Sequence, residues 1–308
     1  MSFQIAVSNV LMTLLYILPG FLLCKMKKAS AQHLSTLSSV LVYICSPCMI
    51  AVNFLTLPYS QEHLLYMLLF FILSLLLQGA FMGLIFLFFR RKMQDARYRI
   101  LTIGSVLGNV GFFGLPVIRA LMPENPEVLS YCSMIMVSMN ILVFTMGVFC
   151  LTGDRRHMSL KPALLNPAML GVGVGLPLFL LGARPHIPDL VFNAVDLLGD
   201  MTTPLCMLIL GIRLASVPFK PLFCRPIIYL NCLFKMVLFP LFCYGCLYFL
   251  PLPQSFKAAM LVLSSVPCAT VILGLAEIHH SETELSANCV LVSTLLCFLT
   301  IPLMTLIL

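Results

Sequence analysis

The sequence predicts an all-α integral membrane protein with ten transmembrane helices, arranged as a 5+5 inverted repeat. Three observations predict this fold: the composition, the spacing of the apolar stretches, and a correspondence between the two halves of the chain. Of 308 residues, 61% are hydrophobic and 9% are charged, whereas about a quarter of the residues of a soluble domain are charged. We therefore expect the lipid bilayer to be the solvent and no nucleic acid to be a partner, despite a net charge of +7.

Apolar stretches of roughly 20 residues, the length that crosses the hydrocarbon core as a helix, recur with short polar gaps between them. They are continuous runs, unlike the alternating strands of a membrane barrel. The first has no basic residue ahead of it and no small-residue cleavage pattern after it, so it is expected to be a retained helix and not a signal peptide. The ten expected spans cover 7–23, 34–57, 64–89, 100–118, 128–151, 163–181, 190–212, 227–250, 258–276 and 285–307.

Most of the 18 Lys and Arg residues lie in odd-numbered loops between these spans. The positive-inside rule then puts the odd loops in the cytoplasm and both termini outside, for a multi-pass protein of the cytoplasmic (plasma) membrane. The basic residues of the odd loops are Lys25, Lys27, Lys28, Arg90, Arg91, Lys92, Arg97, Arg99, Arg155, Arg156, Lys161, Arg213, Lys220 and Arg225.

The two halves of the chain carry similar motifs in the same order. Leu18-Pro19-Gly20-Phe21 in span 1 matches Leu176-Pro177-Leu178-Phe179 in span 6, and Ser46-Pro47 in span 2 matches Thr203-Pro204 in span 7. This predicts a first five-helix repeat over residues 1–153 and a second, inverted repeat over 154–308. Because five is an odd number, the second copy must enter the membrane from the opposite side, which is typical of secondary transporters.

Spans 4 and 9 are short and interrupted by Gly and Pro at corresponding positions of the halves, the pattern that points to a carrier's binding site. Glycine weakens a helix and proline removes a backbone donor. Half-helix N-termini at such breaks expose N–H groups that bind a carboxylate. The alternative is that Gly104 and Gly108 only pack helices closely. The predicted substrate-binding residues are Gly108, Asn109, Gly111, Gly114, Pro116, Asn140, Ser265, Pro267, Thr270 and Asn288.

These motifs resemble the auxin efflux carrier family, which includes plant PIN-type carriers and bacterial malate-permease-like proteins. The residues that carry the resemblance are Gly-Asn-Val-Gly-Phe-Phe-Gly-Leu-Pro at 108–116, Leu-Gly-Asp at 198–200 with Thr-Thr-Pro-Leu at 202–205, Ser-Ser-Val-Pro-Cys-Ala-Thr at 264–270, and the stretch from Glu284 to Leu303.

The resemblance implies an elevator-type carrier in which spans 4 and 9 cross at broken segments. In that family spans 1, 2, 6 and 7 form a scaffold, spans 3–5 and 8–10 form a mobile transport unit, and the scaffold suggests a homodimer. The asparagine that matches Asn109 would contact the substrate carboxylate. Because only about 152–162 separates the halves here, the compact bacterial branch is favoured over long plant carriers of auxin.

Three charged residues lie inside predicted spans: Asp196 and Asp200 in span 7, and Lys235 in span 8. Buried charges are costly, so each is a functional candidate. Either the two aspartates form a proton-coupling site, or Lys235 forms a structural ion pair with one of them. No His or Cys grouping has metal-ligand spacing, so we expect neither a metal nor a cofactor, and H⁺ or Na⁺ remains open as a coupling ion.

The sequence thus favours a secondary transporter of a small organic anion, a mono- or dicarboxylate such as malate. The alternatives are a transporter-like membrane sensor and an auxin or indole-acid carrier. An enzyme is not expected, because both aspartates lie on one helix, whereas an intramembrane aspartyl protease needs carboxylates that converge from different helices.

Overall fold

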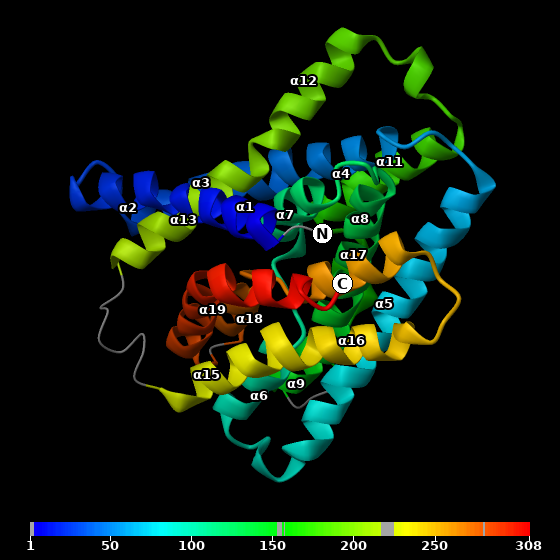
Figure 1. The fold of residues 1–308 in the computed structure, drawn as a ribbon. Helices are drawn as coiled ribbons and strands as arrows, with labels where there is room; N and C mark the ends of the chain where they lie inside the picture. Colours follow the sequence, from blue (N-terminus) through cyan, green and yellow to red (C-terminus); the bar gives the residue numbers. More distant parts are fainter. Residues whose placement is uncertain (1–2, 153–155, 157, 217–224, 280) are drawn as a thin grey trace.

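The computed structural model describes residues 3–152, 156, 158–216, 225–279 and 281–308. Within these ranges every regular element is a helix, as Figure 1 shows. The predicted boundary between residues 153 and 154 lies outside the described residues, and so do Arg155 and Lys220 of the predicted cytoplasmic loops.

In the described part of the chain, seven helical stretches are long and apolar enough to cross a bilayer, as a membrane-embedded helical protein requires. They are Phe3–Lys25 (α1, Phe3–Leu15, and α2, Ile17–Lys25), Ala31–Leu55 (including α3, Leu34–Val40, and α4, Ser46–Leu55), Gln61–Phe88 (α5), Glu127–Thr152 (including α8, Glu127–Leu142, and α9, Val148–Thr152), Asp189–Ser216 (α12, Asp189–Asp200, and α13, Thr202–Ser216), Pro226–Tyr248 (including α15, Pro226–Leu233, and α16, Phe239–Tyr248) and Thr283–Thr305 (α19).

The other three predicted spans are shorter or interrupted. The sixth is α11, Pro167–Leu180, which follows the short α10, Leu160–Leu164. The fourth consists of α6, Ala96–Gly104, and the separate stretch Val110–Leu121, which ends in α7, Leu115–Leu121. The ninth consists of α17, Gln254–Ser264, and α18, Val271–Ile278.

Proline explains most of the irregular turns in these helices. Four π-helical turns are present in the described part of the chain: Leu41–Cys45, Val110–Gly114, Val143–Gly147 and Phe234–Leu238. Three of them end two residues before a proline, at Pro47, Pro116 and Pro240. A proline cannot donate to the preceding turn and its ring clashes with the carbonyl four residues back, so the preceding helix widens locally.

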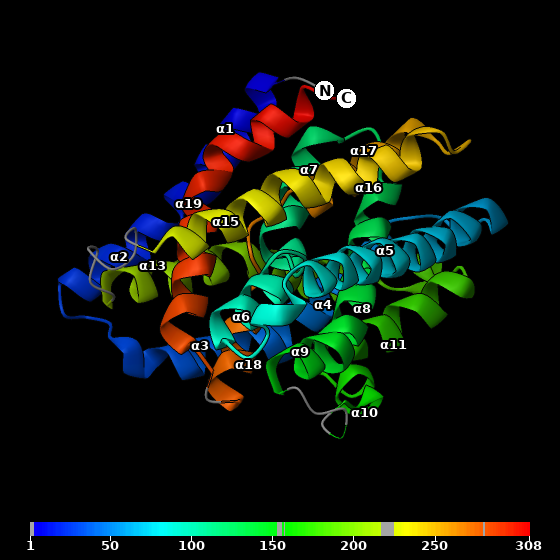
Figure 2. The same ribbon diagram turned by 90° about the horizontal axis from the view of Figure 1, so that it is seen from below.

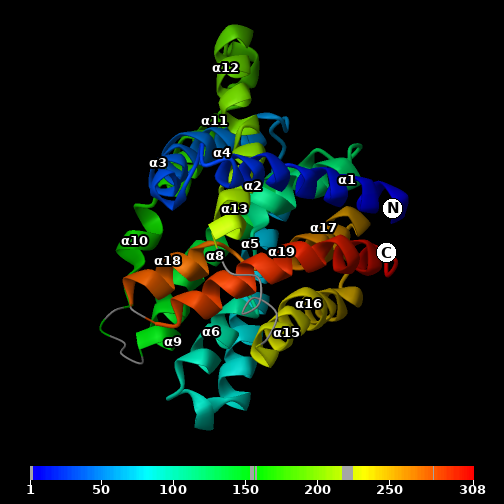
Figure 3. The ribbon, with the colours of Figure 1, turned by 90° about the vertical axis from the view of Figure 1, so that its left-hand side faces the viewer.

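Helices from the two halves of the chain pack in pairs. α2 lies against α13, α4 against α11, and α1 against α19, and α12 projects from the rest of the fold in Figure 1. Figure 2 places both termini at the top, and α3, α10 and α18 at the bottom, while Figure 3 again shows the termini close together. Which membrane face the termini occupy stays a prediction.

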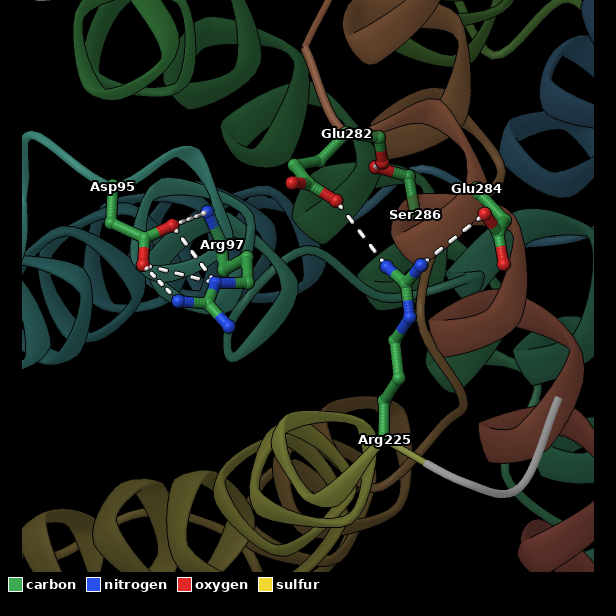
Figure 4. Close-up of polar contacts among 6 residues, drawn as sticks. All are labelled: Asp95, Arg97, Arg225, Glu282, Glu284 and Ser286. Carbon is green, nitrogen blue, oxygen red and sulfur yellow. Dashed lines mark hydrogen bonds and ion pairs between the residues drawn. The ribbon is translucent and has the colours of Figure 1, made fainter. Parts of the chain in front are cut away.

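Ion pairs join segments near the ends of several helices (Figure 4). Arg225, just before α15, contacts Glu282 at 3.5 Å and Glu284 at 3.3 Å, at the start of α19. At the start of α6, Arg97 pairs with Asp95, the residue before this helix, at 2.6 Å, and its hydrogen bonds hold the pKa of the Asp95 carboxyl below its ordinary value. The contacts of Arg225 thus join the starts of α15 and α19, whereas the Asp95 pair is local to α6.

Glycine allows close contact between α11 and α4. A Cβ atom added at Gly171 of α11 would lie 2.6 Å from the Pro47 carbonyl oxygen of α4, whereas one added at Gly173 would meet no atom within 4 Å. Glycine is therefore required on one face of α11 and not on the other.

We predict that Gly171→Ala destabilises the protein by about 1–3 kcal/mol, because the two helix backbones must separate. Gly173→Ala, the matched control in the same helix, should be neutral or stabilising by up to about 1 kcal/mol, because alanine is the better helix former. Thermal unfolding of the purified variants in detergent measures both effects. Equal shifts for the two variants would contradict this account of the contact.

Candidate substrate-binding site

Two breaks in helical structure meet inside the molecule. The chain leaves α6 after Gly104 and resumes a helix at Val110, and it leaves α17 after Ser264 and resumes at Val271. The Asn109 N–H donates to the Pro267 carbonyl at 2.8 Å, and the Ala269 N–H donates to the Leu107 carbonyl at 3.0 Å. The two breaks thus form a short antiparallel bridge, which supplies partners for backbone groups that the helices leave unpaired.

Gly108 permits this close approach. A Cβ atom there would lie 2.8 Å from Val266 Cγ2 and 2.9 Å from Lys235 Nζ, closer than ordinary carbon contacts. The predicted role of Gly108 as a packing glycine and its predicted role beside a site are therefore compatible, because the same residue contacts the second break and lines a cavity.

A cavity of about 420 Å³ lies beside the two breaks. Five of the predicted site residues line it: Gly108, Asn109, Gly111, Asn140 and Thr270. Much of the remaining wall is apolar and includes Phe112, Met136, Met139, Phe144, Ile209 and Leu210. The arrangement is one of a few polar groups in an apolar chamber, which is typical of small-molecule sites.

Asn109 is the polar group at the centre of this arrangement. Its side chain is only 4% exposed, and its amide nitrogen has no hydrogen-bond partner. The group beside it is the Cys206 thiol of α13, and a thiol sulfur accepts hydrogen bonds only weakly. A buried polar group without a partner costs about 1–3 kcal/mol, so a ligand that accepts a hydrogen bond from this amide would remove that cost.

The helical stretch Val110–Leu121 begins at the same place. The first N–H groups of a helix lack partners inside it and carry a partial positive charge. Val110, Gly111 and Phe112 all line the cavity. The Val110 N–H already donates to the Gly108 carbonyl at 2.8 Å, so the part of this helix start that suits an anion in the chamber is the backbone at Gly111 and Phe112.

The other five predicted site residues do not line the cavity. Pro267 accepts the hydrogen bond from Asn109, and the Ser265 hydroxyl donates to the Leu261 carbonyl at 2.6 Å. Asn288 is fully buried in α19 and neither of its amide atoms has a partner. Gly114 and Pro116 belong to the helix that leads away from the break. These residues shape the breaks or lie behind them.

The predicted ion pair between Lys235 and an aspartate is wrong within the described residues. Asp200 instead pairs with Arg119 of α7 at 3.3 Å, and Asp196 lines a separate hollow of about 280 Å³ with Arg119. The pair is absent because α12 projects away from α15 and its neighbours, as Figure 1 shows.

Lys235 is fully buried and its ammonium group donates to the Ser264 carbonyl at 2.6 Å. Ser264 is the last residue of α17, where carbonyl groups lack helical partners and carry a partial negative charge. The ammonium group also lies 4.9 Å from the centre of the Phe239 ring. Lys235 therefore stabilises the end of a broken helix, and no carboxylate of the described residues forms an ion pair with it.

The sequence reasoning missed much of the cavity lining, including Cys206, Arg213 and Glu277. Arg213 was expected in a cytoplasmic loop, because the predicted span ended at residue 212, but α13 continues to Ser216. The available signal was helical spacing. Cys206 and Arg213 are seven residues apart, so they fall on one face of a helix.

The comparisons with known proteins agree with a transport protein. The family model described as "Membrane transport protein" matches residues 5–305. An uncharacterized transporter of Methanocaldococcus jannaschii is 24% identical over 305 residues, which cover 97% of this chain and 98% of the relative. The chain therefore belongs to the membrane transport protein family, that of the auxin efflux carriers.

Proposed function

We propose that this membrane transporter is a secondary carrier of an organic anion with an apolar body, and that the anion binds at the two helix breaks. The single observation that carries the proposal is the buried amide nitrogen of Asn109, which has no partner and lines the cavity. A carboxylate would accept a hydrogen bond from this amide and would lie at the positive end of the helix that begins at Val110.

The cavity wall favours one class of carboxylate. Aliphatic, sulfur-containing and aromatic side chains such as Met136, Phe144 and Leu210 form much of it. The hydroxyl and second carboxylate of malate would lose water there without gaining enough partners. A monocarboxylate with an apolar body fits better, so among the expected substrates we favour this class over malate.

The location of the cavity supports alternating access. Its lining comes partly from the proposed scaffold, α1–α4 and α11–α13, through Ser46, Asn166 and Cys206. The rest comes from the proposed transport unit, α5–α9 and α15–α19, through Asn109, Asn140 and Thr270. A solute between two bodies can be exposed to either side if one body moves, and two inverted copies of one fold would give two states of similar energy.

We further propose that this structure is open toward the end that holds α3 and α18, because a groove lined by Ser35, Ser39 and Glu277 lies there. The ion pair between Arg119 and Asp200 links α7 to α12, two helices that we assign to opposite bodies. Because Arg119 directly follows the predicted fourth span and lies in a predicted external loop, we propose that its contact with Asp200 helps to hold the external side closed.

Replacing Asn109 by Ala should weaken substrate binding. A hydrogen bond to a charged group is worth about 1.5–3 kcal/mol, so the apparent affinity should fall roughly tenfold to a hundredfold. Counterflow of a labelled monocarboxylate in proteoliposomes measures this, with the amount of protein in the membrane held equal.

Asn193→Ala is the matched control, because Asn193 is an exposed residue of α12 and should have no effect. Unchanged counterflow in Asn109→Ala would show that the substrate does not bind at Asn109. Binding of the anion without exchange across the bilayer would indicate a transporter-like sensor instead.

The apolar wall of the cavity predicts that affinity increases with the chain length of the monocarboxylate. Burial of one methylene contributes about 0.8 kcal/mol, so affinity should rise about fourfold per added carbon from acetate through butyrate to hexanoate. Competition binding in lipid nanodiscs, with empty nanodiscs as the blank, measures the series. If malate competed better than hexanoate, the proposed substrate class would be wrong while the Asn109 site could still stand.

A further inference from the structure

A groove of about 590 Å³ continues the cavity toward α3. The two hollows share four lining residues, Ser38, Val42, Arg213 and Glu277, which we call the neck. Beyond the neck, the groove lining includes Ser35, Ser39 and Ser216 together with Ala31, Leu34 and Tyr43. A partly polar groove thus leads to an apolar chamber, and the neck joins the two.

The neck holds two charges of opposite sign. Among the described residues that line the cavity, Arg213 and Glu277 are the charged ones. They come from different helices, α13 and α18, and they interact electrostatically. No contact of 4 Å or less joins the two groups in the described structure, so the guanidinium is left able to accept another anion.

The position of Arg213 relates it to the inner site. Cys206 adjoins Asn109, and Arg213 lies seven residues further along α13, which is about 10 Å along a helix axis. An anion at the neck would therefore be about two helical turns from the Asn109 amide. Arg213 is partly buried, and partly buried charges act more strongly than charges in open water.

We infer that Arg213 and Glu277 form an anion-selecting neck in front of the Asn109 site. The guanidinium binds the carboxylate of a solute that comes along the groove, and the Glu277 carboxylate competes with that solute for the same positive charge. This inference rests on the proposed function and adds to it two specificity-determining residues and the direction of access.

The test uses the full chain in lipid nanodiscs, with hexanoate and its neutral isostere hexanamide as probes. Arg213→Gln should weaken hexanoate binding about fivefold to tenfold at low salt, and Glu277→Gln should strengthen it about twofold to fivefold. Both effects should shrink at 300 mM salt, because screening shortens the range of partly exposed charges. Hexanamide binding should change in neither variant. Equilibrium dialysis at two salt concentrations measures all of these values.

Matched controls are Arg91→Gln and Glu124→Gln, which alter exposed charges outside the cavity and should have no effect. Arg213→Lys should bind hexanoate with an affinity between wild type and Arg213→Gln, because it keeps the charge and loses the planar guanidinium.

Equal changes for hexanoate and hexanamide, or weaker hexanoate binding in Glu277→Gln, would overturn the inference. If Asn109→Ala weakened hexanoate binding while Arg213→Gln and Glu277→Gln had no effect, the proposed function would stand and the inferred role of the neck would be wrong. If wild type bound neither probe, both would fail.

Discussion

The structure depends on one constraint, namely that backbone N–H and C=O groups in hydrocarbon must find partners within the protein. Breaking a helix at the middle of a membrane leaves such groups unpaired. Here the two broken segments pair with each other, through Asn109 with Pro267 and Leu107 with Ala269. Lys235 satisfies the Ser264 carbonyl at the end of α17. Each break therefore supplies hydrogen-bond partners that the other break needs.

Because the two broken segments pair so closely, the residue at position 108 must be small. A side chain at Gly108 would overlap Val266 and Lys235, and larger groups would separate the two segments. The pairing also leaves the Asn109 amide nitrogen unsatisfied beside the cavity. In the proposed carrier the bound anion would supply the missing acceptor. Removing the free-energy penalty of the unpaired amide would then favour anion binding.

Charge is distributed unequally around the cavity. Toward one end, Arg119 and Asp200 pair with each other at 3.3 Å. Toward the other end, Arg213 and Glu277 line the neck without such a close contact. Exposed ion pairs contribute at most about 1 kcal/mol, so the first contact is weak enough to break during a transport cycle. In the proposed mechanism, this difference sets which side of the molecule is open.

The sequence by itself determined that the chain is a membrane-embedded helical protein, because apolar stretches of spanning length are a local property that the bilayer requires. It also located the interruptions near Gly108 and Pro267, since glycine and proline act on the backbone where they occur. Only the tertiary structure decided which polar residues share the cavity. Asn109 and Thr270 meet there, Asn288 does not, and Arg213 belongs to the wall and not to a loop. Likewise, the Lys235 ammonium group donates to the Ser264 carbonyl at the end of α17 and does not pair with the predicted aspartates. The physical reason is that contacts between helices depend on how each helix is rotated and packed against its neighbours, which no local stretch of sequence contains.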